Sequence, residues 1–323
     1  MNTIKDIYGK HKTISLLLLL LIIQSCDIDK KPKNKEKENP LEKVKKENVI
    51  KIITESMDFQ TLDTIPSGWN TFQYVNNSNE THFFLMDKYP EGKTIEDSKR
   101  EVMPPFQNGM DLINQGKPEE SFSEFSKLPE WYSEVVYSGG SGLVSPKNTA
   151  ITTIKLEPGY YIMECYVKMA NGKFHTLMGM SKAIVVIAKD SGNSPPKETI
   201  NITISSKEGI VYDKPITKGK QTLAVHFKDQ IVHENFVGHD VNLVKLANST
   251  DLKTLEKWMN WTNPKGLISP SPEGFIFLGG VNDMPEGSTG YFIVVLEPGD
   301  YVLISEVPNT LSKKMLKTFT VVE

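Results

Sequence analysis

The feature that most limits how this chain can fold is a block of sequence that occurs twice. In the first copy, Gly139-Gly140 is followed by an apolar run that ends in Leu-Glu-Pro-Gly159, and Tyr161 opens the next run. The second copy has Gly279-Gly280, Leu-Glu-Pro-Gly299 and Tyr301, so every element recurs at one constant offset without a gap. Two strand-like runs joined by a Pro-Gly turn are typical of a β-hairpin, and a constant offset indicates two copies of one unit.

The repeat extends upstream of these blocks. Strand-like runs at Trp69–Val75 and Thr81–Met86 correspond to runs at Thr222–Phe227 and Gly238–Val244, which places His82 and His239 at matching strand starts. A short helix-like stretch follows in each copy, at 94–101 and 251–259, and then a loop. The first copy carries a longer excursion before its Gly-Gly pair, and we expect this extra segment to be helical around 119–125.

Many short strands separated by Gly and Pro turns predict an all-β protein. We expect two tandem Greek-key β-sandwiches with short helical insertions, the first over 49–188 and the second over 198–323. The polar Gly- and Pro-containing segment Lys189–Lys197 between them is the predicted boundary.

The N-terminal segment 1–25 reads as a secretory signal rather than as part of the fold. Lys5, Lys10 and Lys12 precede the apolar run 14–23, which is shorter than the about 20 residues that a membrane-spanning helix needs. Ile-Gln-Ser-Cys26 resembles a bacterial lipobox, which implies lipidation of Cys26 and attachment to a membrane of the cell envelope. The alternative is a plain signal peptide followed by a coincidental cysteine.

Residues 26–48 are mostly charged or polar, so they bury too little apolar surface to fold, and we interpret them as a tether. Lys and Arg number 37 and Asp and Glu number 40, a formal net charge of −3. Nucleic-acid binding needs a concentrated basic surface, so this balance argues against such a partner.

The residues with the clearest chemistry lie after the first Pro-Gly turn. Cys165 is followed by His175 and, after four further residues, by Met180, with Met178 as a competing thioether. Cys165 and Cys26 are the two cysteines of the chain, which excludes a disulfide framework and a zinc site built from several cysteines. A single cysteine in a secreted protein is a liability unless it is buried or bound to a metal.

This segment resembles the cupredoxin family, in which one His lies on an upstream strand and Cys, His and Met share the loop between the last two strands. The resemblance implies the cupredoxin-like fold for both repeats and a type 1 copper site in the first. By position, His82 and His175 would be the imidazole ligands, Cys165 the thiolate and Met180 the weak axial ligand. Such a site holds one copper ion and suits electron transfer with a redox partner in the envelope.

The alternative is a metal-free lipoprotein that keeps the scaffold and binds another envelope protein or a ligand, with Cys165 and Met180 as core residues. Ser305 stands where the repeat offset would place a second cysteine, so we expect no copper in the second repeat. His226, His233 and His239 are spaced along strand-like segments, which disfavours a zinc site. A copper oxidase or nitrite reductase would need further histidine clusters, so we do not expect an enzyme.

Overall fold

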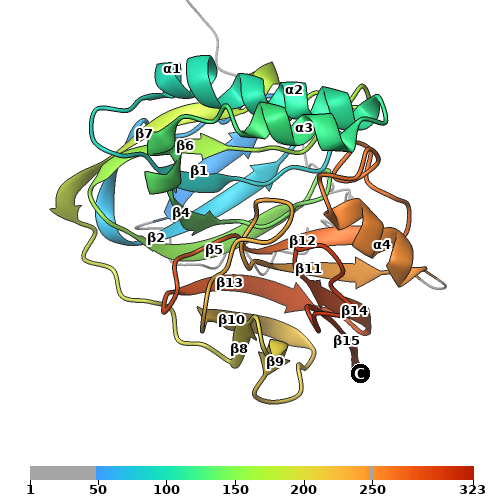
Figure 1. The fold of residues 1–323 in the computed structure, drawn as a ribbon. Helices are drawn as coiled ribbons and strands as arrows, with labels where there is room; N and C mark the ends of the chain where they lie inside the picture. Colours follow the sequence, from blue (N-terminus) through green and yellow to red (C-terminus); the bar gives the residue numbers. More distant parts are fainter. Residues whose placement is uncertain (1–48, 248–249) are drawn as a thin grey trace, which may run out of the picture. The chain divides into compact units, whose positions relative to one another are not determined.

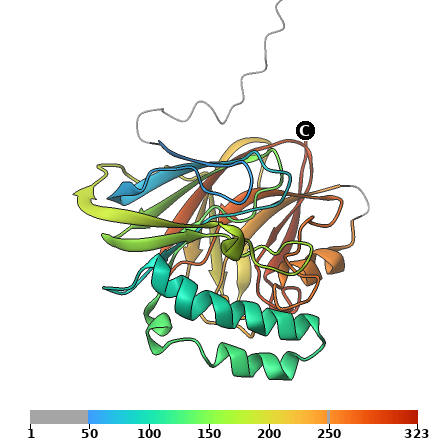
Figure 2. The same ribbon diagram turned by 90° about the horizontal axis from the view of Figure 1, so that it is seen from above.

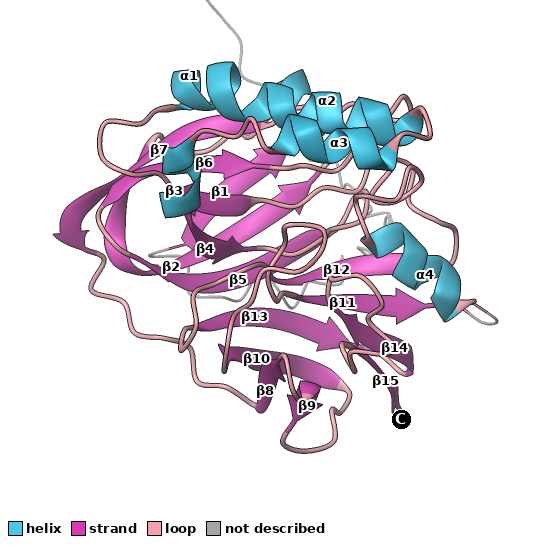
Figure 3. Ribbon diagram, in the orientation of Figure 1, coloured by secondary structure: helices cyan, strands magenta, loops and turns pink. Residues whose placement is uncertain are grey.

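The computed structural model describes residues 49–247 and 250–323, and most of the regular structure in them is β (Figure 3). The strands are β1 Val49–Thr54, β2 Thr64–Asn76, β3 Leu85–Lys88, β4 Val136–Gly140, β5 Thr149–Leu156, β6 Gly159–Glu164, β7 Ser181–Asp190, β8 Ile200–Ser205, β9 Gly209–Tyr212, β10 Gly219–Phe227, β11 Val241–Leu246, β12 Phe275–Val281, β13 Thr289–Leu296, β14 Gly299–Ile304 and β15 Leu316–Val321. The helices are α1 Ile95–Asp97, the π-helix η2 Ser98–Val102, α2 Met103–Asn114, α3 Pro118–Phe125, the 3₁₀-helices η3 Glu130–Glu134 and η4 His175–Met178, and α4 Leu252–Met259.

Each repeat contains the same arrangement of strands in two sheets. In the first repeat β4-β3-β6-β7 form one layer, and β2 pairs with β1 and β5 in the other. The start of β2, residues 64–67, also pairs with β7 and joins the two layers at that edge. The second repeat has β12-β11-β14-β15 and β9-β8-β10-β13 in the corresponding places (Figure 1). Ring contacts across the sheets, such as Phe72 with Phe84 at 5.3 Å and Tyr212 with Phe319 at 6.3 Å, show the two layers packed on each other. The predicted all-β fold of repeated two-sheet units with short helical insertions is confirmed.

The repeated sequence motif has a structural reason in both copies. The hydroxyl group of Tyr161 donates a 2.8 Å hydrogen bond to the carbonyl oxygen of Glu157, and Tyr301 does the same to Glu297. This tyrosine corner fixes the Pro-Gly turn between two strands. At Gly140 and Gly280 an added Cβ would lie 1.8 and 1.9 Å from the carbonyl oxygens of Phe84 and Val241, so only glycine lets these strands meet.

The two repeats join edge to edge. Strand β5 of the first repeat pairs antiparallel with β13 of the second, with Thr152 opposite Phe292 at the centre and Ile151 opposite Ile293. Because Thr152 and Phe292 are equivalent positions of the two repeats, the junction has approximate two-fold symmetry. One sheet therefore continues through both repeats. Within the predicted boundary, 191–197 contains no helix or strand, and the limits of two separate domains stay a prediction.

The long excursion of the first repeat is more helical than the sequence suggested. We expected a helix near 119–125, where α3 lies, and a loop before it, but α2 occupies 103–114 and packs beside α3 (Figure 2). Pro104 and Pro105 would disrupt a helix interior, yet they occupy the first turn of α2, where a missing N–H group is tolerated. The helix-like stretches at 94–101 and 251–259 correspond to α1 with η2 and to α4.

The predicted signal peptide 1–25, the lipidation site Cys26 and the tether 26–48 lie outside the described residues. Among the residues described, no helix has the length and apolar character needed to cross a membrane.

Candidate metal centre

The strands and one loop of the first repeat bring His82, Cys165 and His175 together. His82 precedes β3 and forms a two-way backbone bridge with Val144, with N–O distances of 3.1 and 2.7 Å. Cys165 directly follows β6, and His175 begins η4 in the loop between β6 and β7. Three backbone bonds close this loop: Cys165 N to Met180 O, Met180 N to His175 O, and His175 N to Val167 O.

The donor atoms of these side chains form a compact triangle. The Nδ1 atoms of His82 and His175 lie 3.1 Å apart, and each lies 3.8 Å from Sγ of Cys165. A point equidistant from the three atoms in their plane is about 2.1 Å from each, within the range of about 2.0 to 2.3 Å for metal bonds to His nitrogen and Cys sulfur. The donors therefore fit a single ion without rearrangement.

The surroundings of the three side chains keep both imidazoles unprotonated. All three are fully buried. Burial lowers the pKa of His82 to about 4 and that of His175 to about 3, so both imidazoles are neutral, as metal binding requires. Burial also raises the pKa of the Cys165 thiol to about 12. A metal ion reverses this effect because coordination stabilises the thiolate.

Two imidazoles and one thiolate in a plane are the donors of a blue-copper centre. The described residues contain one group of at least three His, Cys, Asp or Glu side chains whose donor atoms lie within 4.8 Å of one another, and this is that group. The donor set fits copper in its chemistry as well as in its spacing.

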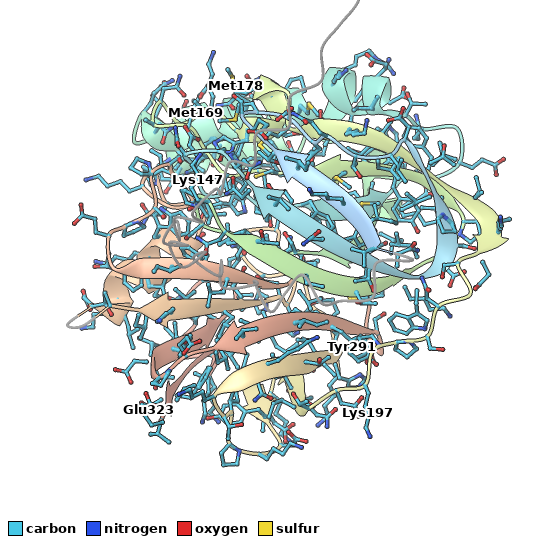
Figure 4. All side chains as sticks on the ribbon, turned by 180° about the vertical axis from the view of Figure 1, so that it is seen from behind. Lys147, Met169, Met178, Lys197, Tyr291 and Glu323 are labelled. Carbon is cyan, nitrogen blue, oxygen red and sulfur yellow. The ribbon has the colours of Figure 1, made fainter. Side chains whose placement is uncertain are left out.

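Met180 and Met178 differ sharply in their environments. Met180 is fully buried and its backbone bonds to both Cys165 and His175, whereas the side chain of Met178 is 47% exposed and lies at the surface (Figure 4). The burial of Met180 agrees with a position beside the centre. Its role as the axial ligand stays a prediction.

Glu80 is a neighbour of the centre that the sequence did not reveal. Its Oε2 atom lies 3.0 Å from Nε2 of His175, and neither atom has another hydrogen-bond partner within the described chain. Asn76 fixes the backbone here because its Nδ2 atom donates to the carbonyl oxygens of both Glu80 and Val144, at 2.8 Å each. The carboxylate is therefore held on the far side of the His175 ring from the proposed metal.

The second repeat shows what the centre becomes when its ligands change. Strand pairing matches His82 with His239, since Leu85 faces Glu164 and Asn242 faces Ile304. The bond from Cys165 N to Met180 O recurs as Ser305 N to Met315 O, and the bond from Met180 N to His175 O recurs as Met315 N to Thr310 O.

The second copy thus keeps a histidine and a methionine but has Ser305 and Thr310 in place of Cys165 and His175. The Oγ atom of Ser305 donates to Asp240 at 2.6 Å, and Nδ1 of His239 lies 3.1 Å from the carbonyl oxygen of Asp229. Ser305 Oγ and His239 Nδ1 thus have partners within the protein, whereas His239 Nε2 has none among the described residues. The constant repeat offset had identified Ser305, but only the backbone hydrogen bonds of the loop identify Thr310 and Met315 as the equivalents of His175 and Met180.

The described histidines of the second repeat do not all approach one point. The rings of His233 and His239 lie 5.2 Å apart, while His226 is exposed on β10, with its Nδ1 atom 3.2 Å from Thr289 Oγ1. The absence of a zinc site at these three residues stays a prediction.

No sequence-family model matches this chain, and no curated protein matches it. Among solved structures it is similar to auracyanin A, a blue copper protein from Chloroflexus aurantiacus, with 18% identity, a TM-score of 0.27 and coverage of 43% of this chain and 98% of that chain. It is also similar to reduced auracyanin from Roseiflexus castenholzii, with 19% identity and a TM-score of 0.26. That match covers 43% of this chain and 97% of that chain. A copper-containing nitrite reductase from Thermus scotoductus is similar over a larger part of the chain. The match covers 85% of this chain and 61% of that chain, with 14% identity and a TM-score of 0.22.

The metal centre lies where the upstream strand start, the end of β6 and the β6–β7 loop meet, which is the place that the family resemblance implied. The arrangement of strands in the two repeats agrees with the cupredoxin-like fold that this resemblance implied.

Proposed function

We propose that the protein is an electron carrier of the bacterial cell envelope that binds one copper ion in its first repeat. His82, Cys165 and His175 hold the ion, and Met180 supplies the weak axial contact. The observation that supports this most strongly is the donor triangle with sides of 3.1, 3.8 and 3.8 Å.

The chain's own contribution to electron transfer is rigidity and exclusion of water. Copper supplies one-electron redox chemistry when bound, and a thiolate with two imidazoles suits both of its oxidation states. The backbone bonds that close the loop around His175 and the bridge between His82 and Val144 fix all three donors. Full burial keeps solvent from adding a ligand, so little needs to move when the charge changes.

The lipid anchor and the location follow from the sequence and complete the proposal. Lipidation of Cys26 would attach the chain to a membrane, and residues 26–48 would hold the folded part away from the lipid surface. At ~3.3 Å per residue, about twenty extended residues reach at most ~65 Å. A redox protein of the envelope is the partner that this arrangement suits, and the proposal assigns no enzymatic reaction to the chain.

The test is titration of the full chain, purified in detergent, with Cu(II). We expect one copper per chain and an intense visible band from the thiolate, and Cys165→Ser should abolish that band. His82→Ala should weaken copper retention because it opens a position to water. A wild-type protein without the band, whose Cys165 reacts with thiol reagents only after unfolding, would favour the metal-free lipoprotein instead.

The second repeat offers a matched control for the axial ligand. Met180→Leu should keep the band and shift the reduction potential, because a long axial bond tunes the site without holding the ion. Met315→Leu changes the equivalent buried methionine and should leave both the band and the potential unchanged. Equal effects of the two substitutions would contradict a role for Met180 at the metal.

A further inference from the structure

A cavity lies beside the metal centre and is not part of it. Its wall includes Glu164 and Tyr166, which flank Cys165, and Thr176, which follows His175. The other sides come from Phe106 of α2 and from Trp261 of the second repeat. The helical excursion of the first repeat thus closes a space that the two repeats leave open.

The cavity has room for a small organic molecule. The space in which the centre of a water molecule can lie is about 80 Å³. One water needs about 10–15 Å³ of such space, so the cavity holds the equivalent of roughly five to eight waters. A single aromatic ring with a short side chain has a comparable size.

Aromatic side chains form a large part of the wall. Phe106 is the centre of this surface, with ring centroids 5.8 Å from Tyr132, 6.4 Å from Phe236 and 6.1 Å from Trp261. The hydroxyl groups of Tyr132 and Tyr137 lie 2.8 Å apart and contact each other. Burial raises the pKa of both tyrosines, yet both keep part of their surface accessible, which is what side chains facing an internal cavity show.

The polar groups of the cavity are acidic. Glu164 and Asp283 line it, and no Lys, Arg or His is among the described residues that do so. Asp87, which is buried and has an Oδ1 atom without a hydrogen-bond partner in the described chain, lies close enough to Glu164 for each carboxyl group to affect the other. Asp87 itself is not part of the wall. Thr176 Oγ1 lies 3.4 Å from Glu164 Oε2, and Gly238 N donates to Asp283 Oδ2 at 2.7 Å. A carboxylate has about four acceptor positions, so both groups can accept further hydrogen bonds from a ligand.

This combination selects for positive charge. An anion would face carboxyl groups and the negative faces of aromatic rings. A neutral ligand would keep water from the carboxylates without supplying a countercharge. A cation pairs with the carboxyl groups and also gains from the faces of the rings.

We propose that this cavity binds a small organic cation, a primary ammonium group carried on an apolar or aromatic skeleton. The ammonium group contacts Glu164 and Asp283, and the skeleton packs among Phe106, Tyr132 and Trp261. Because Glu164 and Tyr166 adjoin Cys165, an occupant lies next to the metal centre. Binding itself does not depend on copper, so it can be measured on the metal-free chain.

The test compares three molecules of one size and shape that differ in charge: 2-phenylethylammonium, 2-phenylethanol and phenylacetate. Each is titrated calorimetrically into the full metal-free chain in detergent, at pH 7.5 and constant ionic strength. We expect the ammonium compound to bind at least tenfold more tightly than the alcohol and the carboxylate, with quenching of tryptophan fluorescence. Equal binding of the alcohol, or no binding of the ammonium compound at millimolar concentration, would overturn the proposal.

Substitutions locate the site. Glu164→Gln and Asp283→Asn keep the size of each side chain, and the Asn oxygen can still accept the bond that Asp283 receives from Gly238 N at 2.7 Å. Each should weaken ammonium binding at least tenfold, whereas Glu157→Gln at an exposed turn should leave it unchanged. Thermal unfolding confirms that each variant is folded. If both cavity variants fold and bind as the wild type does, the cation binds elsewhere and the proposal fails.

Discussion

The carboxylate of Glu80 gives the most quantitative prediction about the proposed copper centre. Its Oε2 atom lies 3.0 Å from Nε2 of His175, on the side of the ring opposite the donor atom Nδ1. A negative charge there stabilises the oxidised ion relative to the reduced ion. Glu80→Gln keeps the shape of the side chain and removes the charge, so the reduction potential should rise.

The size of the shift follows from Coulomb's law. Adding the width of the imidazole ring and a metal–nitrogen bond places the carboxylate about 7 Å from the ion, which gives about 2.4 kcal/mol at an effective dielectric constant of ~20. The Glu80 side chain is 29% exposed, so water screens part of this interaction, and about half the value is a reasonable lower bound. At ~2.3 kcal/mol per 100 mV, the expected rise is about 50–100 mV.

Protein-film voltammetry of the copper-loaded chain measures this shift, with Glu297→Gln at an exposed turn of the second repeat as the control. The rise should shrink in high salt, because Glu80 is partly exposed. A shift below about 10 mV, or one in the opposite direction, would show that the Glu80 carboxylate does not act on the ion through the His175 ring. A chain that binds no copper would instead contradict the proposed function itself.

The other predictions concern stability and attachment. Burial lowers the pKa of Lys168 to about 7, so between pH 7 and 10.5 the unfolded state binds the proton that the folded state has lost, and stability rises with pH. From pH 7 to 9.5 the wild type should gain roughly 3 kcal/mol more than Lys168→Met in urea unfolding, and equal gains would refute this. Gly140→Ala places a Cβ 1.8 Å from a backbone oxygen and should lower the free energy of unfolding by more than about 4 kcal/mol. Gly92→Ala is the control, because no atom lies within 4 Å of the added Cβ. Its positive φ angle alone should lower the free energy of unfolding by about 1–2 kcal/mol. Cys26→Ala should move the protein from the membrane to the soluble fraction, and unchanged partition into detergent would contradict lipidation.

The sequence by itself determined the repeated architecture. Strand alternation, the Pro-Gly turns and the constant repeat offset are local signals, and each corresponds to a local structure: a hairpin, a tyrosine corner or a glycine beneath a crossing carbonyl group. Cys165, His175 and Met180 could be found in the same way because they lie on one loop. The order of residue types along that loop carries the family resemblance.

Only the tertiary structure decided what lies around that loop. Glu80 reaches His175 although the two are far apart in the sequence, and the cavity combines a helix of the first repeat with Trp261 of the second. The lengths of the strand-to-strand connections differ between the repeats, so a constant offset could not match His175 with Thr310, whereas backbone hydrogen bonds do. Helix α2 was missed for a related reason, since the effect of its prolines depends on where in the helix they fall. Contacts between segments far apart in the chain leave no pattern in a single sequence, because the packing of the strands and helices in three dimensions determines which residues meet.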